Sequence, residues 1–449
     1  MPPATALFSR RKPVASRRGI HFDLKGTPPT PRRQMELLEL AGAARLNFAL
    51  LEWEDTYCWS AFPELRNETA FSEKHVRAFL RRAADLKISI IPLVQCFGHM
   101  ENVLSRPRFR RFREISDNPA DLCPLKPGGR NVVIRMIDDI LRTHGGRITH
   151  FHLGGDEAGT IGSCPDCRKY VRRHGKAALY LQHVEPILDH LNQKGIRPIL
   201  WDDMMREWDS GDLRRIAAQA DLMVWSYERE PFHLVKREML DRYARAGVRI
   251  WAGACFKGDK LAADLPDFQA RSENLLSWAR EARSRPMEGI IATGWGRFAT
   301  LMVPSETIET ALDLLLLAGM VFWDGALRDD PAAAARAHLR GAGLPAGRKF
   351  DRCLKAATAL RDWRQSVTHS LDWADAFAQF SGEPDRVSER NLSRKGFDDL
   401  LAQGGRVGEK FLAAHRGLVP DVWLERYVLS RILPLRRRID AIHPQAPSP

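Results

Sequence analysis

The sequence predicts an α/β fold, a (β/α)8 or TIM barrel, followed by a helical C-terminal region. Eight short apolar runs alternate with helix-like segments over residues 19–325. Strict alternation over about 300 residues is typical of this barrel. No Gly-x-Gly-x-x-Gly motif follows the first run, which weakens the alternative of a doubly wound sheet. The strand signal disappears after Asp330.

The first half of the barrel is marked by apolar runs separated by amphipathic segments. The β-branched run at 88–94 is typical of a parallel strand that is buried on both faces. The segment 72–86 carries Val76, Phe79 and Ala83 at helical spacing, with Ser72 as the N-cap. We therefore expect strands at 19–24, 46–53, 88–94 and 148–153, and helices at 31–42, 72–86 and 130–143.

The second half repeats this rhythm with shorter strands. The helical regions expected here are 165–194, 213–220, 231–246, 271–284 and a strongly apolar 305–322. Between them, four apolar runs predict strands at 197–201, 222–227, 248–252 and 289–293.

Three regions follow from these assignments. We expect a flexible basic tail at 1–18, a catalytic barrel at 19–329, and a helical region at 330–449 that packs on the barrel. Within the last region, helices are expected at 332–338, 349–370 and 422–442.

Composition narrows the class of protein and its surroundings. The 449 residues carry a net charge of +13, but the basic clusters are not interleaved with stacking aromatics, so we expect no nucleic-acid partner. The longest apolar stretch, 314–323, is about half of what a membrane span needs. No apolar segment of the secretory type follows the basic N-terminus. Seven cysteines fit a reducing compartment, so we expect a cytoplasmic protein without a membrane partner.

The catalytic residues of such a barrel lie just after its strands. Acidic and amphipathic aromatic side chains gather at these positions. We take the following as candidates: His21, Asp23, Lys25, Glu52, His99, Asp156, Glu157, Trp201, Asp202, Trp225, Tyr227, Trp251, Trp295 and Arg297.

Two features of this rim point to a carbohydrate. A tryptophan ends or follows five strands, at positions 53, 201, 225, 251 and 295. Indole faces stack on the C–H faces of sugar rings, and carboxylates bind hydroxyl groups. In addition, Asp156 and Glu157 follow two glycines at the end of the fourth strand, where a ligand can approach the backbone closely.

The segment His152-Leu-Gly-Gly-Asp156-Glu157-Ala158 resembles the catalytic signature of glycoside hydrolase family 20, the β-N-acetylhexosaminidases. Further segments resemble the hexosaminidase D branch of that family in the same order along residues 20–325. They are His21-Phe-Asp-Leu-Lys25-Gly-Thr-Pro-Pro29, Glu52-Trp-Glu-Asp55, Pro92-Leu-Val-Gln-Cys-Phe-Gly-His99-Met-Glu101, Leu200-Trp-Asp-Asp-Met204 and Thr293-Gly-Trp295. One departure is that Asp23 and Lys25 stand where many members carry an arginine.

The resemblance implies an exo-acting, retaining enzyme that removes terminal β-linked N-acetylglucosamine or N-acetylgalactosamine. In this mechanism the 2-acetamido oxygen of the substrate attacks C1 and forms an oxazolinium ion. Glu157 would be the general acid and base, and Asp156 would orient the acetamido group. Tyr227 is the candidate for binding the acetamido oxygen, and His99 for tuning Glu157 or binding a hydroxyl group. The strand-seven end carries no carboxylate, which argues against a protein nucleophile there.

The resemblance implies no cofactor and no catalytic metal, and the sequence leaves open which sugar is preferred and whether the chain forms a homodimer. Two other functions are compatible with the residues. A metal-dependent sugar enzyme could use His99, Glu101, Asp156, Glu157, Asp202 and Asp203 as ligands. A non-catalytic sugar-binding barrel is the other alternative.

A Cys-x-x-Cys motif, Cys164-Pro-Asp-Cys167, follows the signature. Two cysteines cannot fill a tetrahedral zinc site. His174 could serve as a third ligand, but the sequence offers no convincing fourth. The expectation is therefore two free thiols, with a metal or redox staple as the alternative.

Overall fold

The computed structural model describes residues 8, 12–146, 148–258, 260–297, 300–341, 345–381 and 393–443, with the side chains of 377–381 excepted. Eight parallel strands form one closed barrel in the order of the sequence, which confirms the predicted fold. The strands are β1 (Arg18–Asp23), β2 (Phe48–Glu52), β3 (Ser89–Leu93), β4 (His150–His152), β5 (Arg197–Trp201), β6 (Asp221–Trp225), β7 (Ile250–Lys257) and β8 (Gly289–Gly294).

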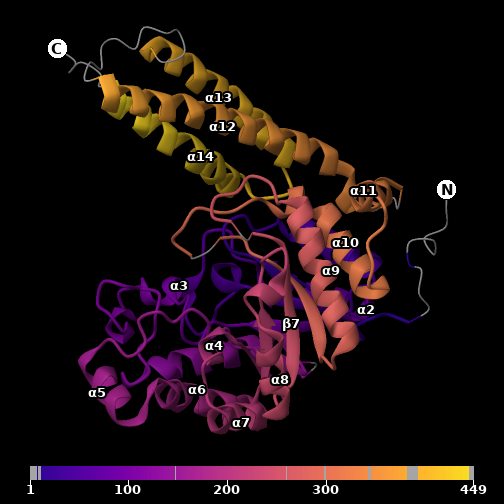
Figure 1. The fold of residues 1–449 in the computed structure, drawn as a ribbon, viewed down its shortest axis with the longest axis vertical. Helices are drawn as coiled ribbons and strands as arrows, with labels where there is room; N and C mark the ends of the chain where they lie inside the picture. The colour runs from indigo at the N-terminus through magenta and orange to yellow at the C-terminus, as the bar shows by residue number, and fades with distance from the viewer. Residues whose placement is uncertain are drawn as a thin grey trace.

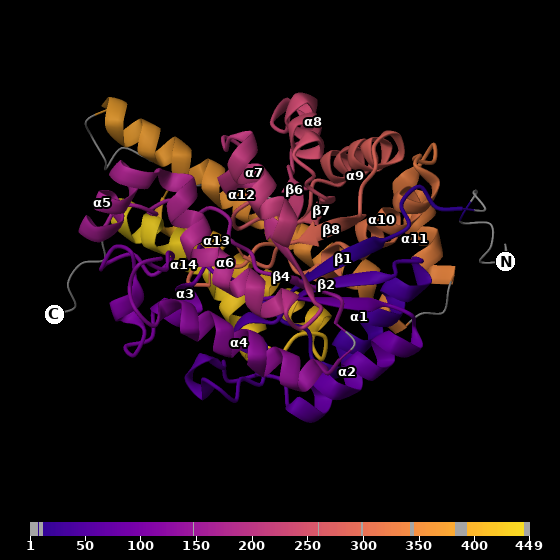
Figure 2. The ribbon, with the colours of Figure 1, turned by 90° about the horizontal axis from the view of Figure 1, so that it is seen from below.

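Helices surround the barrel, as the view along it in Figure 2 shows. They are α1 (Pro31–Ala43), α2 (Glu73–Asp85), α3 (Glu101–Leu104), α4 (Gly129–His144), α5 (Pro165–His174), α6 (Lys176–Asn192), α7 (Ser210–Gln219), α8 (Arg237–Arg245), α9 (Phe268–Ser284) and α10 (Leu312–Asp324). In α2 the predicted stripe of Val76, Phe79 and Ala83 is buried, and the Ser72 side chain accepts a hydrogen bond from the His75 backbone N–H. The single helical region predicted at 165–194 is divided at Gly175, whose φ of 86° ends α5.

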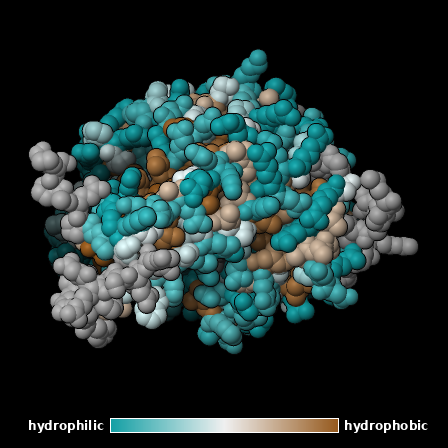
Figure 3. Space-filling model, turned by 90° about the horizontal axis from the view of Figure 1, so that it is seen from above, coloured by the Kyte–Doolittle hydropathy of each residue, from teal (hydrophilic) through white to brown (hydrophobic). Residues whose placement is uncertain are grey.

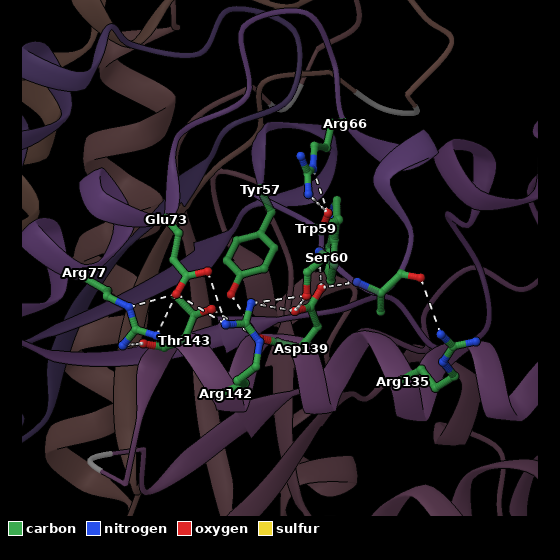
Figure 4. Close-up of polar contacts among 11 residues, drawn as sticks. Tyr57, Trp59, Ser60, Arg66, Glu73, Arg77, Arg135, Asp139, Arg142 and Thr143 are labelled. Atoms are coloured by element: carbon green, nitrogen blue, oxygen red, sulfur yellow. Dashed lines mark hydrogen bonds and ion pairs between the residues drawn. The ribbon is translucent and has the colours of Figure 1, made fainter.

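The loop after β2 is attached to α4 through one buried carboxylate. Asp139 on α4 accepts hydrogen bonds from the backbone N–H groups of Ser60 (2.6 Å) and Ala61 (2.9 Å). Arg142, one turn further on, pairs with Asp139 (3.1 Å) and with Glu73 of α2 (3.2 Å) (Figure 4). This network holds the loop that begins at the carboxyl end of β2 against two helices.

The C-terminal region contains α11 (Pro331–Gly341), α12 (Phe350–Ser381), α13 (Arg394–His415) and α14 (Asp421–Ile442). The last three helices pack together beyond one end of the barrel (Figure 1). No helix was predicted at α13, because Gly404, Gly405 and Gly408 lower the helix propensity of its sequence. The structure shows the reason for one of them: a Cβ at Gly404 would overlap the ring of Trp363, so the glycine permits close helix packing.

The C-terminal helices contact the loops at the carboxyl ends of the strands. The Thr30 N–H, after β1, donates to the Leu418 carbonyl (2.8 Å). Arg431 of α14 is 1% exposed and binds Asp264 (3.1 Å) in the loop after β7 and the Pro304 carbonyl (2.7 Å) in the loop after β8. The helical region is therefore packed on the face of the barrel where a TIM barrel carries its active site.

The N-terminal segment differs from the expected flexible tail over residues 12–18; residues 1–7 and 9–11 lie outside the described residues. The Val14 N–H donates to the Trp323 carbonyl (3.0 Å), Arg17 pairs with Glu288 (2.6 Å), and Arg18 is the first residue of β1. The sequence suggested a tail because basic residues predominate here, but the guanidinium groups of Arg17 and Arg18 bind the carbonyls of Glu288 and Arg45 and the carboxylate of Glu288.

We expect deletion of residues 1–16 to lower the melting temperature by about 2–6 °C, because backbone hydrogen bonds and the buried Phe8 side chain are lost. The segment contacts the amino-terminal ends of the strands, so KM should not change. Deletion of residues 1–7 leaves the described contacts intact and is the control in differential scanning fluorimetry. Equal melting temperatures for the two truncations would contradict the docking.

Within the described residues, no helix has the length and apolar character that a membrane crossing requires. The face in Figure 3 is mostly hydrophilic, with hydrophobic residues in small separate groups.

Candidate active site

The loop after β4 presents the two adjacent carboxylates. Gly154 and Gly155 have φ values of 61° and 83°, a region that other residues rarely adopt, and they turn the chain sharply at the end of the strand. The Tyr180 hydroxyl donates to the Gly155 carbonyl (2.9 Å) and fixes this turn. Asp156 is buried, whereas the Glu157 side chain is 38% exposed. The turn therefore exposes one carboxylate and buries its neighbour.

His99, in the loop after β3, lies between the two carboxylates. Its Nε2 is 3.5 Å from Asp156 Oδ2 and 3.3 Å from Glu157 Oε2. Burial alone would lower the pKa of His99, but the two carboxylates raise it well above the ordinary value of 6.5. The imidazolium form is thus favoured, and its charge offsets the repulsion between Asp156 and Glu157.

A cavity of about 220 Å³ opens at these residues. It brings together seven of the residues predicted from the sequence and two that the sequence did not single out. Its lining consists of Lys25, Gln95, His99, Asp156, Glu157, Trp225, Tyr227, Gly258 and Trp295. Gln95 and Gly258 were missed, although both follow strands, because neither an amide nor a glycine signals chemistry by itself. A larger depression of about 470 Å³ lies between α2 and α4, and its described lining contains no carboxylate.

The predicted residues of the first two strands form a buried ion cluster beside the cavity. Lys25 Nζ is 2.6 Å from Glu52 Oε1 and 3.2 Å from Asp23 Oδ1. Burial opposes the charge on Lys25, but Asp23 and Glu52 raise the pKa of the ammonium group above its usual value. His21 Nε2 lies 3.5 Å from Glu52 Oε2 on the other side. Of this cluster, Lys25 reaches the cavity, and Asp23 and Glu52 hold it in place.

Asp203, which the sequence suggested only as a metal ligand, positions two cavity residues. Its Oδ2 accepts the Glu157 backbone N–H (2.9 Å), and its Oδ1 accepts the Trp225 indole N–H (3.3 Å). Burial and the nearby Asp156 raise the pKa of Asp203 to about 7. An Asp-Asp pair after a strand is too common a pattern to reveal this role.

Three of the five predicted tryptophans do not line the cavity. Trp53 is fully buried, and its indole N–H donates to His144 Nε2 (3.1 Å). Trp201 is fully buried and packs on His152, with 4.3 Å between the ring centroids. Trp251 is also fully buried, and its indole N–H donates to Asp221 (3.1 Å). β7 runs to Lys257, five residues beyond the predicted end, so Trp251 stands near the beginning of that strand rather than at its end.

Two predicted polar residues are held by other side chains. Asp202 is fully buried and binds Arg206 through both oxygens (2.8 and 3.0 Å). Arg297 Nη2 lies 3.4 Å from Asp55 Oδ2, and neither residue lines the main cavity. Glu54 lies on a small adjoining hollow that shares Gln95 and His99 with the cavity. Burial, with a further contribution from Asp55, raises the pKa of Glu54 to about 8.

The sequence is similar to known proteins over the barrel. A model of the glycosyl hydrolase family 20 catalytic domain matches residues 38–248. Hexosaminidase D of Bos taurus is 31% identical over 308 residues, which are 66% of this chain and 89% of the bovine protein. Hexosaminidase D of Homo sapiens is 28% identical over 326 residues, which are 70% of this chain and 67% of the human protein.

Solved structures share the fold at low identity. A chitobiase of Flavobacterium johnsoniae matches with a TM-score of 0.55 and 16% identity over 96% of this chain and 72% of that one. A β-N-acetylhexosaminidase of Bacteroides fragilis matches with a TM-score of 0.52 and 18% identity over 71% of this chain and 68% of that one. These likenesses show the barrel fold.

Proposed function

Since the chain belongs to glycosyl hydrolase family 20 and is therefore a glycosidase, we propose that it removes terminal β-linked N-acetylglucosamine or N-acetylgalactosamine by substrate-assisted catalysis with retention of configuration. The single observation that carries the proposal is the pairing of Asp156 with Glu157 in a cavity whose described lining holds no third carboxylate. A retaining mechanism with a protein nucleophile requires two carboxyl groups that flank the bond, about 5–5.5 Å apart. Adjacent residues on one loop do not flank a sugar in this way.

The two carboxylates differ in a manner that suits different roles. Glu157 is partly exposed at the cavity, where it can reach the leaving-group oxygen and later the attacking water. Asp156 contacts His99 through Oδ2, while its Oδ1 is buried without a hydrogen-bond partner in the described structure. That oxygen is available to accept the acetamido N–H of a substrate. An ionised Asp156 stabilises the positive charge that develops on this nitrogen.

The hydroxyl group of Tyr227 is suited to orient the acetamido oxygen. Burial raises the pKa of Tyr227 well above its ordinary value, so the phenol stays protonated and remains a donor. Its ring lies 4.9 Å from that of Trp225 and 6.4 Å from that of Trp295. These three aromatic rings form the apolar wall against which a pyranose and its N-acetyl group can pack. A cavity of about 220 Å³ is smaller than typical drug-sized sites, which supports binding of one terminal sugar.

The test of this function is a panel of aryl glycosides that differ only at C4 and at the 2-substituent. We expect both β-N-acetylglucosaminide and β-N-acetylgalactosaminide to be cleaved, and the ratio of kcat/KM to identify the preferred sugar. Lys25, Glu54 and Arg297 are the polar groups near the cavity from which a contact with O4 would come. If the aryl group is released from none of the 2-acetamido sugars, the chain would instead be a non-catalytic sugar-binding barrel.

The structure supports a metal-dependent sugar enzyme less well than the sequence does. His99, Asp156 and Glu157 do approach one another closely enough to bind a cation. However, Asp202 is bound to Arg206 (2.8 Å). The Nε2 atom of His99 already contacts the carboxylates of Asp156 and Glu157. The charge of the two acids is thus offset by an imidazolium within the protein.

We expect His99→Gln to lower kcat about 10- to 100-fold, because a charge-assisted contact of about 1.5–3 kcal/mol is removed from the two carboxylates. The raised pKa of His99 means that its charge persists at neutral pH and is lost as the pH rises through that pKa. Wild-type activity should therefore fall on the alkaline side, and the variant should lack this limb of the pH profile. His150→Gln, at the opposite end of β4, is the control. If the His99 variant keeps the alkaline limb unchanged, the titration that causes this limb belongs to another group.

A further inference from the structure

Four potential metal ligands from two loops converge beside the active site. Glu114 and Cys123 belong to the loop between α3 and α4, and Cys164 and Cys167 begin α5. A short antiparallel pairing places the first two next to each other: the Glu114 N–H donates to the Asp121 carbonyl (2.9 Å), and the Cys123 N–H to the Phe112 carbonyl (2.8 Å). His174, the third ligand considered from the sequence, lies at the other end of α5.

The distances within the cluster are those of a tetrahedral site. Cys123 Sγ lies 3.5 Å from Cys167 Sγ and 3.8 Å from Cys164 Sγ. One ligand atom from each of the four residues lies within 4.8 Å of the others. Zn–S bonds of about 2.3 Å in a tetrahedron place sulfur atoms about 3.8 Å apart. Two of the sulfur–sulfur distances therefore match a tetrahedral zinc site, and the Glu114 carboxylate lies close enough to complete it.

The four side chains are largely buried, and hydrogen bonds hold them in place. Glu114, Cys123 and Cys167 are at most 3% exposed. Glu114 Oε1 accepts the Cys164 N–H (2.9 Å), while Oε2 is buried and has no hydrogen-bond partner in the described structure. A buried carboxylate oxygen left without a partner is costly unless a cation binds it. Cys164 is the N-cap of α5, and its sulfur accepts the Cys167 N–H (3.4 Å).

We propose that Glu114, Cys123, Cys164 and Cys167 bind one Zn²⁺ in a closed structural site. Three soft thiolates and one carboxylate select zinc over the hard cations Mg²⁺ and Ca²⁺. On binding, each of the three thiols releases its proton to solvent, and the carboxylate binds in its ionised form. Four protein ligands leave no coordination position for a substrate, so the ion does not take part in the glycosidase reaction.

The site would fix one loop that is hydrogen-bonded to the His99 segment and a second loop that carries Glu157. In the first loop, the Leu122 N–H donates to the Phe97 carbonyl (2.9 Å) and the Met100 N–H to the Ala120 carbonyl (2.9 Å), on either side of His99. In the second, the Thr160 hydroxyl donates to Asp121 (2.6 Å), three residues after Glu157. A zinc ion that joins these loops thus fixes the positions of His99 and Glu157 relative to each other.

The first experiment measures metal in the full-length chain, purified with a reducing agent and without added chelator. We expect about one zinc per chain by plasma mass spectrometry. Removal of the ion should lower the melting temperature by about 5 °C or more. Co²⁺ added to the metal-free chain should give the thiolate-to-cobalt charge-transfer band and the intense visible bands of a tetrahedral site.

Variants identify the ligands. Cys123→Ser and Cys164→Ser should lose stoichiometric zinc and weaken the charge-transfer band, and Glu114→Gln should weaken zinc affinity at least tenfold. Cys353→Ser is the matched control, because Cys353 is as buried as Cys123 but lies in the C-terminal region, where its thiol contacts the Ala414 carbonyl. If the ligand variants do not fold, the cobalt spectrum of the wild-type chain still decides the question.

Three outcomes would overturn the site: a wild-type chain that purifies without metal and takes up neither Zn²⁺ nor Co²⁺, a disulfide between two of the three cysteines in the non-reduced chain, or a control variant that loses zinc like the others. The glycosidase assay is separate. Zinc-free chains that are reloaded with Co²⁺ or Cd²⁺ should regain wild-type kcat, since the ion is structural. Hexosaminidase activity without a metal would refute only the zinc site, and bound zinc without activity would refute only the proposed function.

Discussion

Replacement of Glu157 by glutamine is expected to lower kcat about 10²- to 10⁴-fold on substrates whose leaving group is a sugar or an alkyl alcohol. Glutamine keeps the size of the side chain but cannot donate a proton to the leaving oxygen. An aryl glycoside with a strongly acidic phenol leaves without protonation, so its first step should slow less than about tenfold. The measurement is kcat/KM for a series of leaving groups of increasing basicity, in which the variant should show a much steeper dependence than the wild type.

The second half of the reaction supplies an independent test of Glu157. As a base it deprotonates the attacking water, whereas azide needs no base. Azide should therefore restore turnover of activated substrates by Glu157→Ala and yield the glycosyl azide. Glu228→Gln is the matched control, because Glu228 is an exposed carboxylate just after Tyr227 that does not line the cavity. Equal losses of activity on good and poor leaving groups would remove Glu157 from the acid role.

Replacement of Asp156 by asparagine is expected to lower kcat by about 30- to 1,000-fold, which corresponds to losing one charge-assisted hydrogen bond of about 2–4 kcal/mol. The variant keeps the shape of the side chain but loses the charge that stabilises the oxazolinium ion. A thiazoline analogue of this intermediate should inhibit the wild type competitively and more tightly than the product sugar does. That advantage should largely disappear in the variant, while the affinity for the product changes little.

Substrates without an acetamido group test the same step from the other side. Plain β-glucosides should be hydrolysed negligibly, because they carry no internal nucleophile. Efficient cleavage of glucosides, or a covalent enzyme adduct trapped by a fluorinated sugar, would contradict substrate assistance and require a protein carboxylate in its place.

Selecting residues just after the strands identified the acidic pair that we propose as the chemical centre, because its two members are adjacent in the sequence. Asp156 and Glu157 are adjacent, and the glycines before them mark the turn at the end of β4. The same selection included tryptophans that do not reach the cavity. It placed Trp251 at a strand end because the apolar run breaks at Gly253, yet β7 continues to Lys257. Hydrophobic patterns locate strands well but locate their ends poorly.

The amino-acid sequence by itself determined the eight-stranded barrel, the helical C-terminal region and the acidic pair after β4, because alternating periodicity and adjacent residues depend only on short stretches of chain. Only the tertiary structure decided which distant residues meet: His99 between the two carboxylates, Asp203 beneath Glu157, and Glu114 with Cys123 beside the Cys-x-x-Cys motif. It also decided that residues 12–18 dock on the barrel. The physical reason is that such contacts form when loops close over tens of residues, and the geometry of that closure is set by the packing of the whole barrel rather than by local sequence.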